Sequence, residues 1–335
     1  MCKENRQEWI DIAKGLGMLL VVLGHSVAFG SKVHNLIFAF HMPFFFLLSG
    51  LVYRKDKIQL IIRKRFNSLL RPYICFCVLG IGLMFIVGPK VSWKQVFIDL
   101  YFGNPEHIWV SSVWFLIALF ITTVLFSVVL KIKSTYAQYM TVFFLFVTGV
   151  IYGKFYHVGI IKHRMPLEID VAMVALFFFS LGYYGKKYLS DFLNICREKS
   201  HVGGILLCGI AVIFMLLSYL NHRVNLRSME YGNAILFVGT ALLGSLALML
   251  SCQVLINGFV KKALIWVGKN NIYFLGAQAI GVRAFIKILN IAIGTKYELY
   301  SLPYGYAIIC FLFTCLFSLL FTLGAQKTKN ILEKI

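Results

Sequence analysis

The stretch WIDIAKGLGMLLVVLGHSVAF, residues 9–29, is an apolar run of membrane-spanning length that carries three ionisable side chains. As a helix it covers about 30 Å, the thickness of a bilayer core. Asp11, Lys14 and His25 are unfavourable at membrane depth unless they face protein or a wet cavity, so they indicate a candidate site. At about 100° per residue, Lys14 and His25 lie about 20° apart around the helix and about 16 Å apart along it, with Asp11 within about 60° of Lys14. One face of this helix therefore presents a carboxylate, an ammonium group and an imidazole.

The composition of the whole chain predicts an all-α polytopic membrane protein. Of its 335 residues, 60% are hydrophobic and 14% are charged, and the mean hydropathy is +0.81, which no soluble domain of this size approaches. The formal charge of +20 could suggest a nucleic-acid partner, but membrane topology explains it better, so we expect none. The eight cysteines lie mostly in apolar runs without a C-x-x-C pair, so we expect buried hydrophobic roles and no metal site.

About ten apolar segments are expected to cross the bilayer, joined by short basic connections, so the chain is expected to form one domain over residues 1–335. With both termini in the cytoplasm, 22 of the 33 Lys and Arg residues fall on the cytoplasmic side, as the positive-inside rule requires. The same residues favour contact with anionic lipids. The expected spans are 9–29, 35–53, 71–88, 111–130, 136–153, 169–185, 202–220, 233–254, 263–286 and 303–325.

This topology places Asp11 and Lys14 near the cytoplasmic mouth of the first span and His25 toward the outer leaflet. The turn at residues 30–35 sends the chain back, so His41 lies early in the second span at a similar depth. The two histidines could therefore face one cavity, although the pattern alone fits a packing role for His41 equally well. Pro43 removes a backbone donor and predicts a loosened helix nearby.

The segment RKDKIQLIIRKRFNSLLRPY, residues 54–73, carries seven basic side chains before the third span. One interpretation is an ordinary cytoplasmic anchor. The other is a docking surface for a phosphate-rich ligand, because arginine forks match phosphate oxygens. Arg71 precedes Pro72 at the membrane mouth in either case.

Several motifs together resemble the acyltransferase 3 family of bacterial integral membrane proteins: Asp11 and Lys14-X10-His25, FHMPFFFLLSG at residues 40–50, Arg71-Pro72-Tyr73, and Trp114-Phe115-Leu116. The resemblance covers about residues 6–325. The opening RQEWIDIAKGLGMLLVVLGHS and the later LIWVGKNN, residues 264–271, are similar to the fucose 4-O-acetylase-like branch. The resemblance implies a ten-span protein of the bacterial inner membrane. Such a protein moves an acyl group, usually acetyl, from cytoplasmic acyl-CoA to a hydroxyl of a cell-envelope sugar.

This chemistry requires a base for the hydroxyl and donors for the oxyanion. We assign the base to His25, with a covalent acyl-histidine as the variant, and a second proton-transfer or oxyanion role to His41. The acyl-CoA donor is expected at charged groups on the cytoplasmic side: Arg6, Asp11, Lys14, Arg63 and Arg71. The sugar acceptor is expected at Tyr73, Trp114, Asn270, Asn271 and Gln278.

The sequence departs from the family pattern at two of these positions. Lys14 stands where arginine is commoner, so it keeps the charge but loses bidentate phosphate recognition. Gln278 stands where relatives commonly carry a histidine, ten residues after Gly268. A glutamine can orient a substrate but cannot act as a base.

Other interpretations stay open. Asp11 and Lys14 could form a plain interfacial ion pair, Asn270 and Asn271 could join helices, and Trp114 could be an interfacial anchor. A transporter or flippase shares the many spans, but the chain has no convincing internal repeat and only 13 acidic residues, most of them near span ends. Glu168 and Asp170, before the sixth span, are expected to form a solvated helix start, with acceptor binding as the alternative. The sequence does not determine the oligomeric state.

Overall fold

The computed structural model describes residues 2–87, 92–103, 105–221, 223–254 and 256–332, whose regular structure is helical apart from one isolated bridge between Asn225 and Glu230. Within these residues, ten helical segments are long and apolar enough to cross a membrane, which confirms the all-α polytopic prediction. They cover Glu8–Ser26, Lys32–Leu51, Ile58–Ile86, Ser111–Val129, Thr135–His157, Pro166–Tyr184, Ser200–Leu220, Ala234–Val254, Asn271–Ile293 and Tyr304–Thr328.

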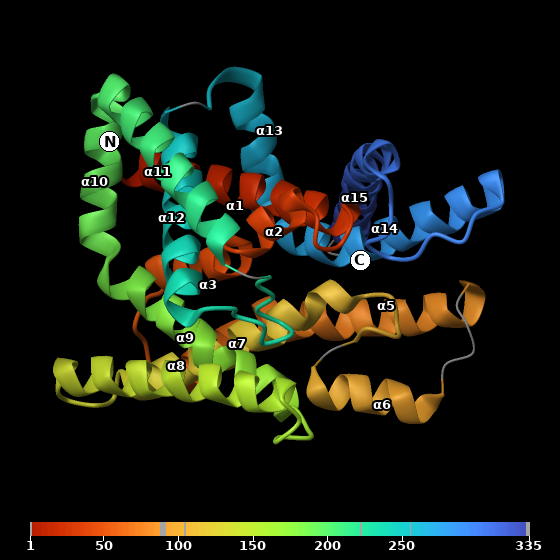
Figure 1. The fold of residues 1–335 in the computed structure, drawn as a ribbon, viewed down its shortest axis with the longest axis horizontal. Helices are drawn as coiled ribbons and strands as arrows, with labels where there is room; N and C mark the ends of the chain where they lie inside the picture. The colour runs from red at the N-terminus through yellow and green to blue at the C-terminus, as the bar shows by residue number, and fades with distance from the viewer. Residues whose placement is uncertain (1, 88–91, 104, 222, 255, 333–335) are drawn as a thin grey trace. The chain divides into compact units, whose positions relative to one another are not determined.

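The helices group into two compact units (Figure 1). The terminal unit joins Met1–Ile37 to Ile256–Ile335, and the central unit is Phe38–Leu255. The α-helices in chain order are α1 (Cys2–Ser26), α2 (Lys32–Phe38), α3 (His41–Leu51), α4 (Ile58–Arg65), α5 (Arg71–Val87), α6 (Trp93–Phe102), α7 (Trp114–Val129), α8 (Thr135–His157), α9 (Ile169–Tyr184), α10 (Lys186–Glu198), α11 (Ser200–Leu220), α12 (Ala234–Val254), α13 (Gly258–Lys269), α14 (Asn271–Ile293) and α15 (Tyr304–Leu332). Short π and 3-10 turns cover Phe66–Leu70, Ser111–Val113 and Pro166–Glu168.

In the terminal unit, two glycines let α1 and α13 cross at backbone contact. A Cβ atom at Gly15 would lie 2.1 Å from the carbonyl oxygen of Leu264, and one at Gly268 would lie 1.9 Å from that of Asp11. Close approach of this kind requires the absence of a side chain. The crossing therefore holds the acidic start of the polar stripe against the Gly-Lys-Asn segment.

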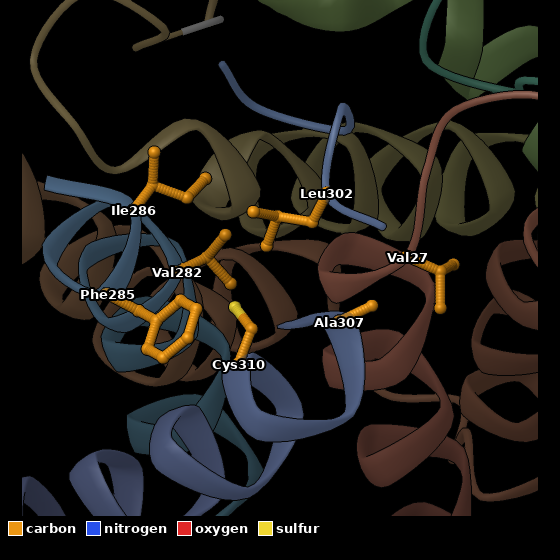
Figure 2. Close-up of a cluster of buried hydrophobic side chains, with 7 residues drawn as sticks. All are labelled: Val27, Val282, Phe285, Ile286, Leu302, Ala307 and Cys310. Carbon is orange, nitrogen blue, oxygen red and sulfur yellow. The ribbon is translucent and has the colours of Figure 1, made fainter. Parts of the chain in front are cut away.

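At the other end of α1, an apolar cluster joins it to α14, α15 and the connection between them (Figure 2). Its buried members are Val27, Val282, Phe285, Ile286, Leu302, Ala307 and Cys310. Removing these side chains from water or lipid contact fixes the last turn of α1 in place.

In the central unit, glycines also allow close backbone contact where α3 crosses α9. A Cβ at Gly50 would lie 1.8 Å from the carbonyl oxygen of Phe179, and one at Gly182 would lie 1.9 Å from that of Leu47. The two glycines thus face the partner helix reciprocally, and α8 lies against the other side of α9 (Figure 1).

Three spans differ from the sequence prediction. The second is broken at residues 39–40, just before His41, and Pro43 falls in the first turn of α3, where a missing amide hydrogen needs no partner. The third begins at Ile58 rather than at residue 71, because the apolar positions among the basic residues share helical spacing and bury Ile61 and Leu69.

The ninth span covers Asn271–Ile293 rather than residues 263–286. The apolar run from residue 263 includes the separate helix α13, which ends at Lys269. Asn270 ends α13 and begins α14, with φ of −108° and ψ of 16°. Asn is a weak helix former that favours such caps, so the Asn270-Asn271 pair divides the apolar run in two.

Candidate active site

His25 lies in the last turn of α1 and contacts a tyrosine that is 275 residues away in sequence. Its Nδ1 atom lies 2.5 Å from the hydroxyl oxygen of Tyr300. Tyr300 belongs to the connection between α14 and α15 and has a φ of 63°, which is uncommon for a residue other than glycine. The amide of Phe29 donates to the carbonyl oxygen of Tyr300 at 2.7 Å, so this connection is held against the end of α1. The side-chain contact orients the imidazole and links its tautomer to the tyrosine hydroxyl.

A second histidine, His34, completes an aromatic group around Tyr300. The His34 side chain is fully buried, and its ring meets that of Tyr300 edge-on with centroids 6.0 Å apart. The ring of Phe29 lies 5.1 Å from His34 and 6.0 Å from Tyr300. Sequence reasoning missed both His34 and Tyr300. A third histidine in the twenty residues around His25 and His41 was a usable signal, whereas nothing local marks Tyr300.

The charged start of the stripe forms one ion pair. Lys14 Nζ lies 3.6 Å from Asp11 Oδ1, and the two side chains are 30% and 20% exposed. Arg6 belongs to α1, but its side chain lies outside the described part of the structure. Lys14 and His25 are thus joined by a continuous helix, eleven residues or about 16 Å apart.

Asn270 is engaged by the protein itself. Its amide nitrogen donates to the Trp266 carbonyl at 2.9 Å, and its amide oxygen accepts from Gln326 Nε2 of α15 at 2.7 Å. The bond from Gln326 joins the end of α13 to α15, which is the interhelical role that the sequence left open. Asn271, the first residue of α14, is half-buried.

Gln278 behaves differently. Its side chain is 1% exposed, and neither amide atom has a hydrogen-bond partner among the described residues. Val282, one turn further along α14, packs in the same cluster as Val27, which directly follows α1. Residues four apart share a helix face, so Gln278 lies on the face of α14 that carries Val282. A buried amide without partners is unfavourable by about 1–3 kcal/mol, and a ligand hydroxyl or carbonyl would remove that cost.

The remaining predicted site residues belong to the central unit. His41 is the first residue of α3 and is buried, with its ring centroid 4.7 Å from that of Phe38. Tyr73 is buried beside the Cys77 thiol, and Trp114 is buried at the start of α7. Arg63 and Arg71 are exposed on α4 and at the start of α5. Their roles in donor and acceptor binding remain predictions.

The basic segment at residues 54–71 forms an exposed surface of the central unit. Of its seven Lys and Arg side chains, six are exposed and Arg65 is half-buried. Asp56 is its acidic member; a side-chain hydrogen bond from Lys64 at 3.0 Å is the largest cause that lowers the pKa of Asp56. The surface therefore presents strong positive charge to whatever approaches it.

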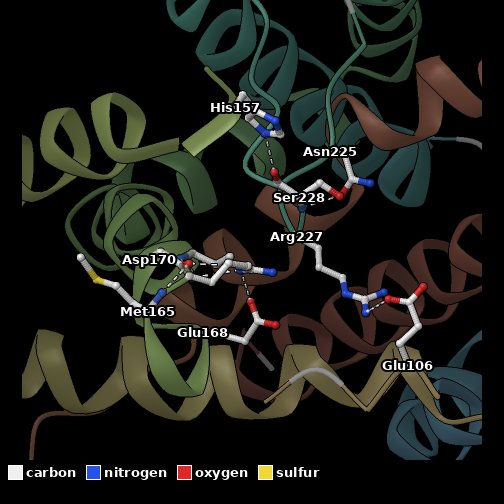
Figure 3. A network of polar contacts seen from close by, with 10 residues as sticks. Glu106, His157, Met165, Glu168, Asp170, Asn225, Arg227 and Ser228 are labelled. Atoms are coloured by element: carbon white, nitrogen blue, oxygen red, sulfur yellow. Dashed lines mark hydrogen bonds and ion pairs between the residues drawn. The ribbon is translucent and has the colours of Figure 1, made fainter. Parts of the chain in front are cut away.

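The prediction of a solvated start for the sixth span is wrong. Glu168 and Asp170 are fully buried (Figure 3). Arg164 binds both of them. Arg164 Nη2 lies 2.8 Å from Glu168 Oε2 and 3.0 Å from Asp170 Oδ1, and Nε lies 3.1 Å from Asp170 Oδ2. Burial acts to lower the pKa of Arg164, but the two carboxylates raise it above its ordinary value, so the guanidinium stays charged. The ion pairs offset the cost of burying these carboxylates at the end of a membrane span.

Together, the ten spans and the polar stripe that ends in a tyrosine-bound histidine define a multi-pass membrane protein with a candidate site on its first helix. Residues 7–323 match the family model described as an acyltransferase domain. The chain therefore belongs to the acyltransferase 3 family and is a membrane acyltransferase, as the sequence motifs predicted. Comparison with curated proteins and with solved structures finds no match.

Proposed function

We propose that the protein transfers an acetyl group from cytoplasmic acyl-CoA to a hydroxyl of a cell-envelope sugar, in the bacterial inner membrane, and belongs to the fucose 4-O-acetylase-like branch. The observation that carries this proposal is the 2.5 Å contact between His25 Nδ1 and the Tyr300 hydroxyl. A histidine oriented through one ring nitrogen is prepared for proton transfer at the other.

In the proposed reaction, His25 donates its Nδ1 hydrogen to the Tyr300 oxygen and presents the Nε2 lone pair to the acceptor hydroxyl. The hydroxyl oxygen attacks the thioester carbonyl carbon while Nε2 takes the hydroxyl proton. The tetrahedral intermediate then collapses, the carbon–sulfur bond breaks, and the imidazolium returns the proton to the leaving thiolate. Tyr300 stabilises the positive charge on the ring during this sequence.

Gln278 is the best-supported partner for a substrate on the terminal unit. Its buried amide nitrogen can donate to the oxyanion, and its amide oxygen can accept from a sugar hydroxyl. Unlike a histidine, it takes no proton, so the proposed chemistry uses His25 as the base and keeps His41 as the candidate second proton carrier. Trp114 and Tyr73 remain candidates for contact with the sugar ring.

On the donor side, Lys14 and Asp11 mark the end of α1 where the CoA moiety would bind, with Arg6, Arg63 and Arg71 as further candidates. The polar face of α1 leads from this ion pair to His25 over about 16 Å. The extended arm of CoA is a chain of amides and methylenes that suits such a path. The exposed basic surface at residues 54–71 would attract the nucleotide phosphates.

Membrane vesicles that contain the chain provide the test. In inside-out vesicles, labelled acetyl-CoA is added to the cytoplasmic face, and the wild-type protein should release CoA thiol and label envelope glycan. His25→Ala and His25→Gln should lower both by about 10²–10⁴-fold while the protein stays inserted, and His201→Ala, at an exposed histidine of α11, should change neither. Full transfer by His25→Ala would remove His25 as the base. Solute movement without any consumption of acetyl-CoA would favour a transporter instead.

A further inference from the structure

Three connections of the central unit meet at one end of it (Figure 3). They join α6 to α7, α8 to α9, and α11 to α12. Arg227 Nη2 lies 3.2 Å from Glu106 Oε2, and His157 Nε2 lies 2.8 Å from the carbonyl oxygen of Ser228. Each connection follows an odd-numbered span, so all three belong to one side of the membrane. The positive-inside bias predicts that this is the outer side.

A pocket of about 260 Å³ opens among the first two of these connections and α6. Asp99 forms its fixed polar wall and is 5% exposed. It accepts hydrogen bonds from the His107 amide at 2.9 Å, from His107 Nδ1 at 3.0 Å and from Gln95 Nε2 at 3.2 Å. These bonds hold a carboxylate, an amide and an imidazole, all of which line the pocket, in set orientations.

Two aromatic side chains and a basic segment also line the pocket. The aromatic side chains are Phe102 of α6 and Tyr156 of α8, and the basic segment is residues 162–164. Arg164 brings little net charge, because its guanidinium is already bound by two buried carboxylates. Glu106, bound by Arg227, adds a second acidic group to the lining.

We propose that this pocket binds one neutral pyranose ring of the acceptor glycan. Planar carboxylate, amide and imidazole groups can each bond to neighbouring sugar hydroxyls, and an aromatic ring can cover the C–H face of the sugar. Polar groups that converge beside aromatic side chains are a general feature of small-molecule sites. The choice of a sugar rests on the proposed function, which requires a hydroxyl-bearing acceptor.

The size and charge of the pocket favour this ligand over others. Its volume falls below the roughly 300–1,000 Å³ typical of pockets for drug-sized ligands, which suits a single ring and excludes an enclosed nucleotide. Asp99 and Glu106 would repel a phosphate or a carboxylate, while Lys162 opposes a simple cation. A neutral ligand with several hydroxyl groups is repelled neither by the acidic nor by the basic side chains of the pocket.

Saturation-transfer NMR on the full chain in nanodiscs provides a direct measurement, with methyl hexopyranosides as probes. We expect binding by the wild-type protein and a loss of about tenfold in affinity for Tyr156→Ala. Tyr136→Ala, which removes an exposed tyrosine at the other end of α8, should bind like the wild type. Inorganic phosphate at the same concentration should not displace the sugar.

The same measurement on His25→Ala separates this proposal from the catalytic one. Sugar binding that survives His25→Ala and is lost in Tyr156→Ala supports the pocket whether or not acetyl transfer is found. If Tyr156→Ala and Tyr136→Ala bind equally, or if phosphate displaces the sugar, the pocket is not a sugar site. That result would leave the role of His25 intact, provided that thiol release still depends on His25.

Discussion

Replacing Tyr300 by phenylalanine removes one oxygen atom from the candidate active site and keeps its packing. The ring of Tyr300 contacts His25, Phe29 and His34, and all three contacts persist in Tyr300→Phe. The hydroxyl that lies 2.5 Å from His25 Nδ1 is lost. A hydrogen bond to a charged group contributes about 1.5–3 kcal/mol, and this one is at its strongest when the imidazole becomes charged in the transition state. At about 1.4 kcal/mol per factor of ten, we expect kcat to fall roughly 10- to 150-fold.

The assay is CoA thiol release by vesicles over a range of acetyl-CoA concentrations. Because Tyr300 is placed at the imidazole and not at the donor, KM for acetyl-CoA should stay unchanged while kcat falls. Tyr297→Phe is the matched control, since Tyr297 lies in the same connection and its ring contacts Tyr306 instead. It should retain wild-type kcat.

A double-mutant cycle decides whether Tyr300 acts through His25. In the His25→Ala background, Tyr300→Phe should cause no further loss, because the group that the hydroxyl orients is already absent. Two independent losses that multiply, or full activity in Tyr300→Phe alone, would refute the reasoning.

Further expectations concern the packing and the buried polar groups. Gly268→Ala places a Cβ 1.9 Å from the Asp11 carbonyl and should lower unfolding stability by about 1–3 kcal/mol in detergent, whereas Gly204→Ala, with nothing within 4 Å, should not lower it. Equal effects of the two glycine changes would argue against the close crossing. Gln278→Leu removes an amide without partners in the described structure and should raise the thermal stability by about 1–3 kcal/mol while reducing transfer; a loss of stability would mean that the amide is satisfied. Arg164→Met leaves the buried carboxylates of Glu168 and Asp170 unpaired and should destabilise the chain by about 3–5 kcal/mol, which thermal unfolding measures; a small effect would show that the carboxylates become protonated at little cost.

The spans were predictable because length and apolarity decide them, whereas the helix breaks were not all read correctly. The segment at residues 263–286 is apolar on average, which led to the prediction of one span, yet α13 ends at Lys269 and a new helix begins at Asn271. The signal was the Asn270-Asn271 pair, whose side chains favour caps over helix interiors. The start of the third span was predicted too late. Basic residues between apolar ones resemble a loop in a hydropathy window, although here they lie in the helical segments that bury Ile61 and Leu69.

In the candidate site, the positions of residues along one helix were predictable from the sequence, whereas contacts between residues far apart in the chain were not. Helical spacing placed Asp11, Lys14 and His25 on one helix, because that geometry depends on α1 alone. The partner of His25 lies 275 residues away, and no periodicity relates the two positions. The partner of Glu168, in contrast, lies close to it in the sequence. Arg164 precedes it by four residues, and an arginine next to two acids before a membrane span is itself a sign of a buried ion pair.

Asn270 and Gln278 were both predicted to bind the acceptor, but the structure gives their amide side chains different surroundings. Asn270 makes one hydrogen bond within α13 and one to Gln326 of α15, so its amide is already satisfied within the protein. Gln278 is more deeply buried and has no partner in the described residues, which makes it a net cost to the folded chain without a ligand. A buried amide of this kind gains most from a bound group, since a hydroxyl or an oxyanion would satisfy what the protein leaves unsatisfied. Gln278 shares a face of α14 with Val282, whose cluster also contains Val27 directly after α1, so such a group would bind on the side of α14 that carries this cluster.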